Sequence, residues 1–191
     1  MSTKFACYNR STRNAAIITG RTILAASEQV IRSTFDINVF GALSCLKLFL
    51  PAMIAANRGH TLVMSSATAF LTVSSVVDNS ASKAAVTTIV EGLRTELKHK
   101  HGNSHVKLSA YFPGTISTTL FQGIVQPAPD FMLPILHPDE VANRIICPLQ
   151  RGERYVVTSY IKNEAIGKIN MFSGADRISD ILAKLLQYQE S

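Results

Sequence analysis

Polar side chains of types that can move a proton gather in four short segments of this 191-residue sequence: 38–41, 59–66, 80–85 and 113–118. The first three contain asparagine, serine and lysine, and the fourth opens with a proline-glycine pair. A proton must be delivered wherever negative charge develops on an oxygen, and a lysine cation favours the ionised form of a nearby hydroxyl. The elements between the segments must bring them to one place if they act together.

The three cysteines, Cys7, Cys45 and Cys147, are widely spaced and form no CxxC pair. An odd number of cysteines at such spacing argues against a disulfide framework and against a zinc site. We therefore expect a reducing compartment, the cytoplasm, and no bound metal.

Composition predicts one globular domain, 1–191, because 47% of the residues are hydrophobic and 17% are charged. The net charge of +6 is densest over 98–107, where no aromatic residues are interleaved, so we expect a solvated helix end and no nucleic-acid binding. Residues 1–13 contain no apolar targeting segment, and Lys47 and Pro51 interrupt the longest apolar stretch. These features predict neither a signal peptide nor a membrane span.

Two kinds of hydrophobic pattern alternate along the chain. Apolar residues recur at helical spacing over 27–57 and 80–100, whereas 60–66 and 106–112 are the short apolar runs typical of buried strands. This order predicts parallel strands joined by crossover helices. His60, at the start of the first strand, is expected to satisfy its ring nitrogens at the surface.

The C-terminal part of the chain begins with an irregular segment, 115–138, which is rich in proline and has no clear period. Such segments beside the ends of parallel strands often cover a binding crevice. A helix is expected from His137 onward, a last strand over 154–160 and a closing amphipathic helix over 176–187. The sequence therefore predicts an α/β fold, a parallel sheet with flanking helices.

The four polar segments have the order and spacing of motifs in the short-chain dehydrogenases/reductases, which the chain resembles over about 14–153. Residues 38–41 resemble the N-V-x-G segment of that family, and 59–66 resemble its G-H-I-V-x-x-S-S strand. Residues 80–85 are similar to the S-A-S-K-A-A start of its active-site helix, and 113–118 to its P-G-x-I-x-T turn. The resemblance implies a Rossmann-like fold and NAD(P) as the cofactor.

The resemblance also implies a role for each matched side chain. Asn38 would hold a water on the proton-relay path, and Ser66 would orient and polarise the substrate carbonyl. Lys83 would bind the nicotinamide ribose and lower the pKa of the catalytic tyrosine. The residues expected beside the nicotinamide are Pro113, Gly114 and Thr118.

Asn79 stands at the position of the catalytic tyrosine, thirteen residues after Ser66 and four before Lys83. A spacing of four residues places two side chains on one face of a helix. A carboxamide does not titrate in the useful range, so Asn79 cannot replace the tyrosine as acid or base. Loss of such a group slows a reaction by about 10²- to 10⁴-fold. Tyr111 is the only nearby candidate to replace this phenol, and packing in a core strand is its simpler role.

The cofactor-phosphate part of the family pattern has no counterpart in the sequence. Family members open with a strand, a T-G-x-x-x-G-x-G turn and a helix whose amides hold the pyrophosphate, and none of the ten glycines falls at that spacing. Asn14 and Ala15 match the N-N-A-G segment of the family, which makes Asn14 a cofactor-binding candidate, whereas Arg13 and Ala16 depart from it. Residues 8–12 are polar and turn-like where the family has an apolar strand.

Together these features predict an NAD(P)-dependent oxidoreductase site for an alcohol or carbonyl on a small lipophilic substrate, impaired or inactive in this chain because it lacks the N-terminal βαβ cofactor-binding portion and the tyrosine. The alternatives are a non-catalytic interaction module and a fragment of a longer active reductase. In the family, the helices that correspond to 27–57 and 80–100 pack across a dimer interface. Small residues on the second helix, such as Ala84 and Ala85, would permit close approach, so we expect a homodimer or heterodimer through these helices.

Overall fold

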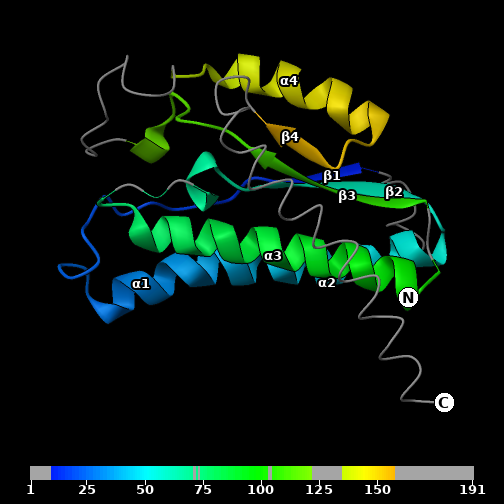
Figure 1. Ribbon diagram of the computed structural model, residues 1–191, viewed down its shortest axis with the longest axis horizontal. Helices are drawn as coiled ribbons and strands as arrows, with labels where there is room; N and C mark the ends of the chain where they lie inside the picture. Colours follow the sequence, from blue (N-terminus) through cyan, green and yellow to red (C-terminus); the bar gives the residue numbers. More distant parts are fainter. Residues whose placement is uncertain (1–9, 71, 73, 103–104, 122–134, 158–191) are drawn as a thin grey trace.

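The computed structural model describes residues 10–70, 72, 74–102, 105–121 and 135–157, in which helices cover both faces of a parallel sheet (Figure 1). The sheet has four strands in the order β1 (Arg10–Arg13), β2 (Gly59–Met64), β3 (Val106–Phe112) and β4 (Tyr155–Val157). One face is covered by α1 (Glu28–Phe35), α2 (Gly41–Ala55) and α3 (Val77–His99), and the other by α4 (Pro138–Arg151). The predicted α/β architecture is confirmed.

The central strands send alternate side chains into two apolar clusters. Val63 of β2 and Phe112 of β3 belong to the cluster under α2 and α3, whereas Met64 and Tyr111 belong to the cluster under α4. Successive residues of a strand point to opposite faces, and both faces of this sheet are covered. This double burial explains why β2 is a continuous apolar run and not an alternating one.

The predicted helices have the expected positions, with two refinements. The first one consists of α1, a π-helical turn (η2, Asp36–Phe40) and α2, and Ser27 caps its start by accepting a hydrogen bond from the Val30 amide at 3.4 Å. The second one, α3, begins at Val77, three residues earlier than predicted. Asn79 therefore lies in the first turn of α3, one turn before Lys83.

The expectation that the segment before Arg13 is turn-like was wrong for its described part. Residues Arg10–Arg13 form β1, which pairs in parallel with β2 from His60 to Val63. Ser11 Oγ lies 2.9 Å from Thr61 Oγ1 across this pair. A strand at the edge of the described sheet needs no apolar run, because one of its sides is not covered by a neighbouring strand. Tyr8 and Asn9 lie outside the described residues.

The expectation that His60 lies at the surface was also wrong. Its side chain is only 5% exposed. Nδ1 lies 2.9 Å from the Leu149 carbonyl oxygen of α4, and Nε2 lies 2.6 Å from Ser109 Oγ of β3. A histidine can be buried when both ring nitrogens have partners, and here those partners come from elements that are distant in the sequence.

The C-terminal predictions are partly inside the described residues. The helix expected from His137 is α4, with Pro138 in its first turn, and the expected last strand corresponds to β4. Of the irregular segment 115–138, a short 3-10 turn (η4, Thr119–Phe121) and a parallel bridge between Ile116 and Leu136 are described. Residues 122–134 and the predicted helix 176–187 lie outside the described residues.

The helical run from α1 to α2 has the length and composition of a membrane-spanning helix. Glu28–Ala55 contains 28 residues, and an 18-residue window within it has a mean hydropathy of 1.8. Core helices of globular proteins pass the same test, and here α1 contacts α3 while α2 contacts β2. The expected absence of a membrane span therefore stays a prediction.

Candidate active site

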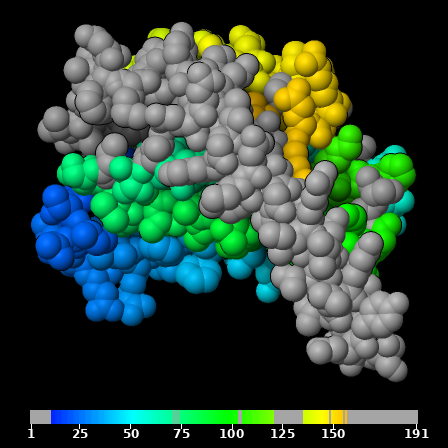
Figure 2. Space-filling view, in the orientation of Figure 1, coloured from blue at the N-terminus to red at the C-terminus, as the bar shows by residue number. Residues whose placement is uncertain are grey.

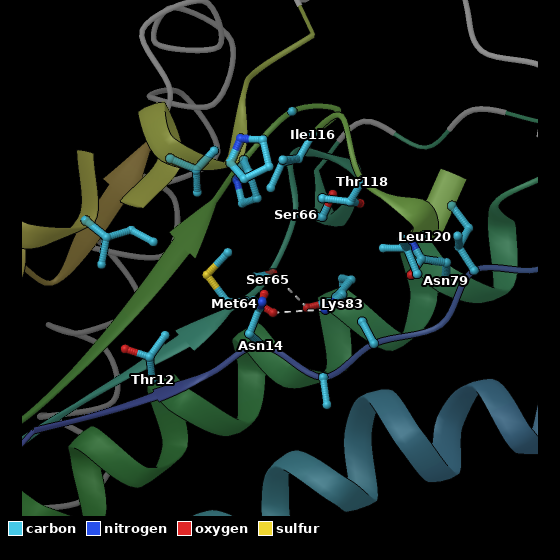
Figure 3. A pocket seen from close by; sticks show the side chains of 18 of the residues that line it. Thr12, Asn14, Met64, Ser65, Ser66, Asn79, Lys83, Ile116, Thr118 and Leu120 are labelled. Carbon is cyan, nitrogen blue, oxygen red and sulfur yellow. Dashed lines mark hydrogen bonds between the residues drawn. The ribbon is translucent and has the colours of Figure 1, made fainter. Parts of the chain in front are cut away.

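A cavity of about 470 Å³ lies where β1, β2 and β3 end and α3 and α4 begin (Figure 3). The carboxyl ends of parallel strands are the usual place for a ligand crevice in such sheets. All the site residues predicted from the sequence line the cavity, except Asn38, which lies behind Asn79. The lining residues from this predicted set are Asn14, Ser66, Asn79, Lys83, Pro113, Gly114 and Thr118.

Lys83 brings a positive charge into the cavity from the second turn of α3. The residue is 6% exposed, and its ammonium group donates a hydrogen bond to the Met64 carbonyl oxygen at 3.0 Å. Burial lowers the pKa of Lys83 from 10.5 to about 8, because the charged form is poorly solvated there. Within the described part of the chain, no carboxylate forms an ion pair with this lysine.

The two serines that follow β2 have different surroundings. Ser65 is buried against α3, where its hydroxyl donates to the Lys83 carbonyl oxygen at 3.1 Å and lies 2.8 Å from Thr87 Oγ1. Ser66 is half-buried and caps the short 3-10 turn η3 (Ala67–Ala69). Its Oγ accepts hydrogen bonds from the amide of Thr68 at 3.1 Å and from the hydroxyl of Thr68 at 2.9 Å. Both serines line the cavity, but the Ser65 hydroxyl is bonded to α3, whereas the Ser66 hydroxyl, among the described residues, is bonded only within its own turn.

The amide of Asn38 fixes the orientation of Asn79. The backbone N–H of Ile17 donates to Asn38 Oδ1 at 2.8 Å, which identifies the other atom of this amide as the donor Nδ2. This Nδ2 donates to Asn79 Oδ1 at 3.2 Å and to Ser82 Oγ at 2.9 Å. Because the partner of a donor must be an acceptor, the oxygen of Asn79 faces Asn38 and its NH₂ group is left for the cavity.

The π-helical turn η2 carries Asn38 into this position. A π-turn inserts one extra residue into a helix and is frequent at functional sites. Asn38 is only 2% exposed, and its Nδ2 also lies 3.0 Å from the Ile17 carbonyl oxygen. The apolar period is continuous across this turn, so no feature of the sequence marks it.

Asp78 is a site neighbour that the sequence did not single out. Its buried carboxylate accepts hydrogen bonds from Thr19 at 3.1 Å and from Thr34 at 3.0 Å. These bonds tie the segment after β1 to α1 and to the first turn of α3. One sequence feature could have indicated a buried polar contact on this helix. Thr34 and Asn38 are two polar residues four positions apart in an otherwise apolar segment.

Tyr111 does not take the place of the missing phenol. Its side chain is fully buried in the cluster under α4, and it does not line the cavity. Burial raises the pKa of Tyr111, and its hydroxyl has no hydrogen-bond partner among the described residues. This phenol packs in the core, on the face of the sheet opposite α3.

The family of the chain follows from comparison with known proteins. The family profile described as short chain dehydrogenase matches residues 12–128. The chain is 34% identical over 145 residues to Epidermal retinol dehydrogenase 2 of Mus musculus, a match that covers 75% of this chain and 46% of the relative. It is 26% identical over 172 residues to Short-chain dehydrogenase/reductase 3 of Homo sapiens, covering 84% and 56%.

A solved structure has the same fold. The short chain dehydrogenase from Burkholderia cenocepacia J2315, solved in complex with NADP, superposes with a TM-score of 0.69 at 26% identity and covers 93% of this chain and 68% of that structure. The chain therefore belongs to the short-chain dehydrogenase/reductase family, a family of oxidoreductases. It spans about half the length of the curated relatives that it matches.

Proposed function

We propose that this chain carries the carbonyl-binding part of an NAD(P)-dependent short-chain oxidoreductase for a lipophilic substrate, and that its proton-transfer step is impaired at position 79. The observation that carries the proposal is the placement of Asn79. It lines the same cavity as Ser66 and Lys83, with its oxygen held by Asn38.

The chemistry supports an impaired proton step. Hydride addition to a carbonyl leaves negative charge on the oxygen, and a proton must reach that oxygen for the alcohol to form. The NH₂ group of Asn79 can donate a hydrogen bond to the oxygen but cannot release a proton at working pH. Ser66 can polarise the carbonyl, and the positive charge of Lys83 would favour the ionised form of a tyrosine, which is not among the described residues that line the cavity.

The walls of the cavity support a lipophilic substrate. Met64, Ile116, Val141 and Ile145 are the larger apolar side chains that line it from β2, the segment after β3 and α4. The name of the mouse relative, Epidermal retinol dehydrogenase 2, supports an apolar alcohol or aldehyde as the first compound to test. An apolar body would bury against these side chains while its oxygen meets Ser66.

The residues of the cavity also fit the nicotinamide end of NAD(P). The ammonium of Lys83 has N–H bonds left beyond the one to Met64, and Gly114 and Thr118 line the adjacent wall. These three residues would hold that end of the cofactor, which supplies the hydride when it is bound. Asn14 would contact the cofactor from the segment after β1.

The test is restoration of the phenol. We expect Asn79→Tyr, in a chain extended by the N-terminal segment of the mouse relative, to reduce retinal with NADPH or NADH about 10²- to 10⁴-fold faster than the same chain with Asn79. Asn79→Phe is the matched control, because it adds the ring without the hydroxyl. No turnover above buffer with Asn79→Tyr, or equal rates for Tyr and Phe, would contradict the proposal.

A second candidate function is an interaction module, and one observation favours it. Phe40 and Leu48 are 57% and 62% exposed on the outer side of the α1–α2 run, whose blue to cyan surface lies along the lower edge of Figure 2. Isolated apolar residues at a surface need no partner, but two on one helical run suit a dimer interface with α3 of a second copy or of an intact relative. In such a dimer, the exposed apolar residues of α1 and α2 would be covered by protein, as expected for a cytoplasmic protein, and not by lipid.

The oligomeric state tests this second candidate. In size-exclusion chromatography with light scattering, we expect the wild-type chain to have twice the mass of the monomer. We expect Leu48→Glu to have the mass of the monomer. Lys47→Glu, at the neighbouring exposed position, is the control for added negative charge. A monomeric wild-type chain, or recovery of the wild-type chain in the membrane fraction, would contradict a dimer through this surface.

A further inference from the structure

We propose that the cavity binds the carboxylate of an apolar acid, with Ser66, Asn79 and Lys83 as hydrogen-bond donors to its oxygens. This inference rests on the proposed function, because it concerns the same cavity and the same replacement at position 79. It concerns a ligand that is held without chemical change. Ser66, Asn79 and Lys83 line this cavity, and each of them presents only a hydrogen-bond donor to it.

Asn79 is a donor because its oxygen is already used. Asn79 Oδ1 accepts from Asn38 Nδ2, and the amide of Asn38 is itself held by the Ile17 N–H. Turning the Asn79 amide over would set its NH₂ against the NH₂ of Asn38 and break this bond. The group that Asn79 offers to a ligand is therefore NH₂.

Ser66 is a donor because both acceptor positions of its oxygen are filled. The amide and the hydroxyl of Thr68 both donate to Ser66 Oγ. A hydroxyl has two lone pairs and one proton, so the proton is the part that remains. Ser66 lines the cavity, where a ligand oxygen can accept this proton.

Lys83 adds charge to the two neutral donors. One of its three N–H bonds is directed at the Met64 carbonyl oxygen, and no carboxylate of the described residues balances the ammonium. A buried charge without a counter-ion is unfavourable, and an anion that enters the cavity removes part of that penalty. Figure 3 shows the labelled side chains of Ser66, Asn79 and Lys83 around one cavity.

A carboxylate of an apolar acid matches these groups better than the other ligand classes do. Its two oxygens only accept hydrogen bonds, whereas an alcohol must also find an acceptor for its own proton. A neutral carbonyl can accept, but it does not balance the charge of Lys83. A small inorganic anion balances the charge, but it leaves the apolar wall formed by Met64, Ile116 and Ile145 without a partner.

Isothermal titration of the 191-residue chain at about pH 7 tests the inference with three probes. Decanoate and 1-decanol have the same hydrocarbon chain and different head groups, and acetate has the head group without the chain. We expect decanoate to bind at least about tenfold more tightly than either of the other probes. Equal affinities for decanoate and decanol would overturn the inference, and so would equal affinities for decanoate and acetate.

Variants then test the donors one at a time. Asn79→Leu keeps the approximate volume and removes the NH₂ group, and Lys83→Met removes the charge. We expect each change to weaken decanoate binding about tenfold and to weaken decanol binding by clearly less, because an alcohol carries no charge and makes a weaker hydrogen bond. Thr88→Val is the control on the exposed side of α3, and it should change neither affinity. Unchanged decanoate binding in Asn79→Leu or in Lys83→Met would overturn the inference.

The two proposals fail separately. If the extended Asn79→Tyr chain reduces retinal but the wild-type chain prefers decanol, the carboxylate site is refuted and the proposed function stands. If decanoate binds as expected but Asn79→Tyr gives no turnover, the reductase proposal is refuted, and the cavity is a site for acids only.

Discussion

Two polar side chains near the site, Asn79 and Tyr111, lie on opposite faces of the central sheet and have different surroundings. On the α3 face, the amides of Asn38 and Asn79 are bonded to each other and held by the backbone of Ile17. On the α4 face, the hydroxyl of Tyr111 is buried with no partner among the described residues. Strand alternation places the Tyr111 side chain on the α4 face, and among the described residues no phenol lines the cavity. A phenol is thus useful only at position 79.

Tyr111→Ala should have the largest effect on stability, because it removes a fully buried ring from the α4 cluster. We expect the free energy of unfolding to fall by about 3–5 kcal/mol, as for other buried aromatic residues. Tyr111→Phe should change it by less than about 1 kcal/mol, since the hydroxyl that is removed has no described partner. Urea unfolding measures both values. A large loss in Tyr111→Phe would mean that the hydroxyl has a stabilising partner and that the contrast between the faces is wrong.

Lys83 should make stability depend on pH in a direction set by its lowered pKa. The unfolded chain keeps a proton on Lys83 up to about pH 10.5, whereas the folded chain releases it above about pH 8. The unfolded state binds more protons in this window, so the free energy of unfolding should rise with pH, by roughly 3 kcal/mol for this group. Lys83→Met should lack this rise. Urea unfolding of both proteins at pH 8 and at pH 10.5 makes the comparison, and parallel pH dependences would contradict a buried, unbalanced ammonium.

Asn38→Leu should disrupt the ordered network on the α3 face. It leaves the Ile17 N–H and the Asn79 oxygen without partners in a buried place, which costs about 1–3 kcal/mol in the free energy of unfolding. The Asn79 amide also becomes free to turn, so the preference for decanoate over decanol should shrink. Wild-type stability together with an unchanged preference would show that Asn38 does not orient Asn79.

Thr87→Val should have the smallest measurable effect. The Thr87 hydroxyl donates to the Lys83 carbonyl oxygen at 2.9 Å and contacts Ser65, and its loss should lower the free energy of unfolding by about 1 kcal/mol. Thr88→Val, which removes a similar bond on the exposed side of α3, should have almost no effect. Equal losses for the two variants would contradict a special role for the buried contacts.

The sequence predicted the parts of the fold that depend on local pattern. The apolar period located α3 and the helical run that contains α1 and α2, and the apolar runs located β2 and β3. The edge strand β1 was missed because its pairing with β2, and not its own composition, makes it a strand. His60 was misplaced for the same reason, since the groups that satisfy its ring come from β3 and α4.

For the site, the motifs identified the residues but not their orientation. The spacing of Asn79 and Lys83 predicted that they share a helical face, and both line the cavity. The direction of the Asn79 amide depends on Asn38, whose own amide is oriented by the Ile17 backbone N–H. These contacts join residues that are distant in the sequence, so no local pattern predicts them. The partnership of Asp78 with Thr19 and Thr34 was missed on the same grounds. The catalytic and cofactor-binding roles of these residues stay predictions.

The central claim is that position 79 offers the cavity a fixed hydrogen-bond donor and no titratable proton. Proton–nitrogen correlation spectra of the Asn79 side-chain NH₂ group test it most directly, with the signals assigned by their loss in Asn79→Leu. Addition of decanoate should move one of the two NH₂ protons to a hydrogen-bonded shift, and addition of decanol should move it by less. Signals that stay in place when decanoate is bound would contradict the account.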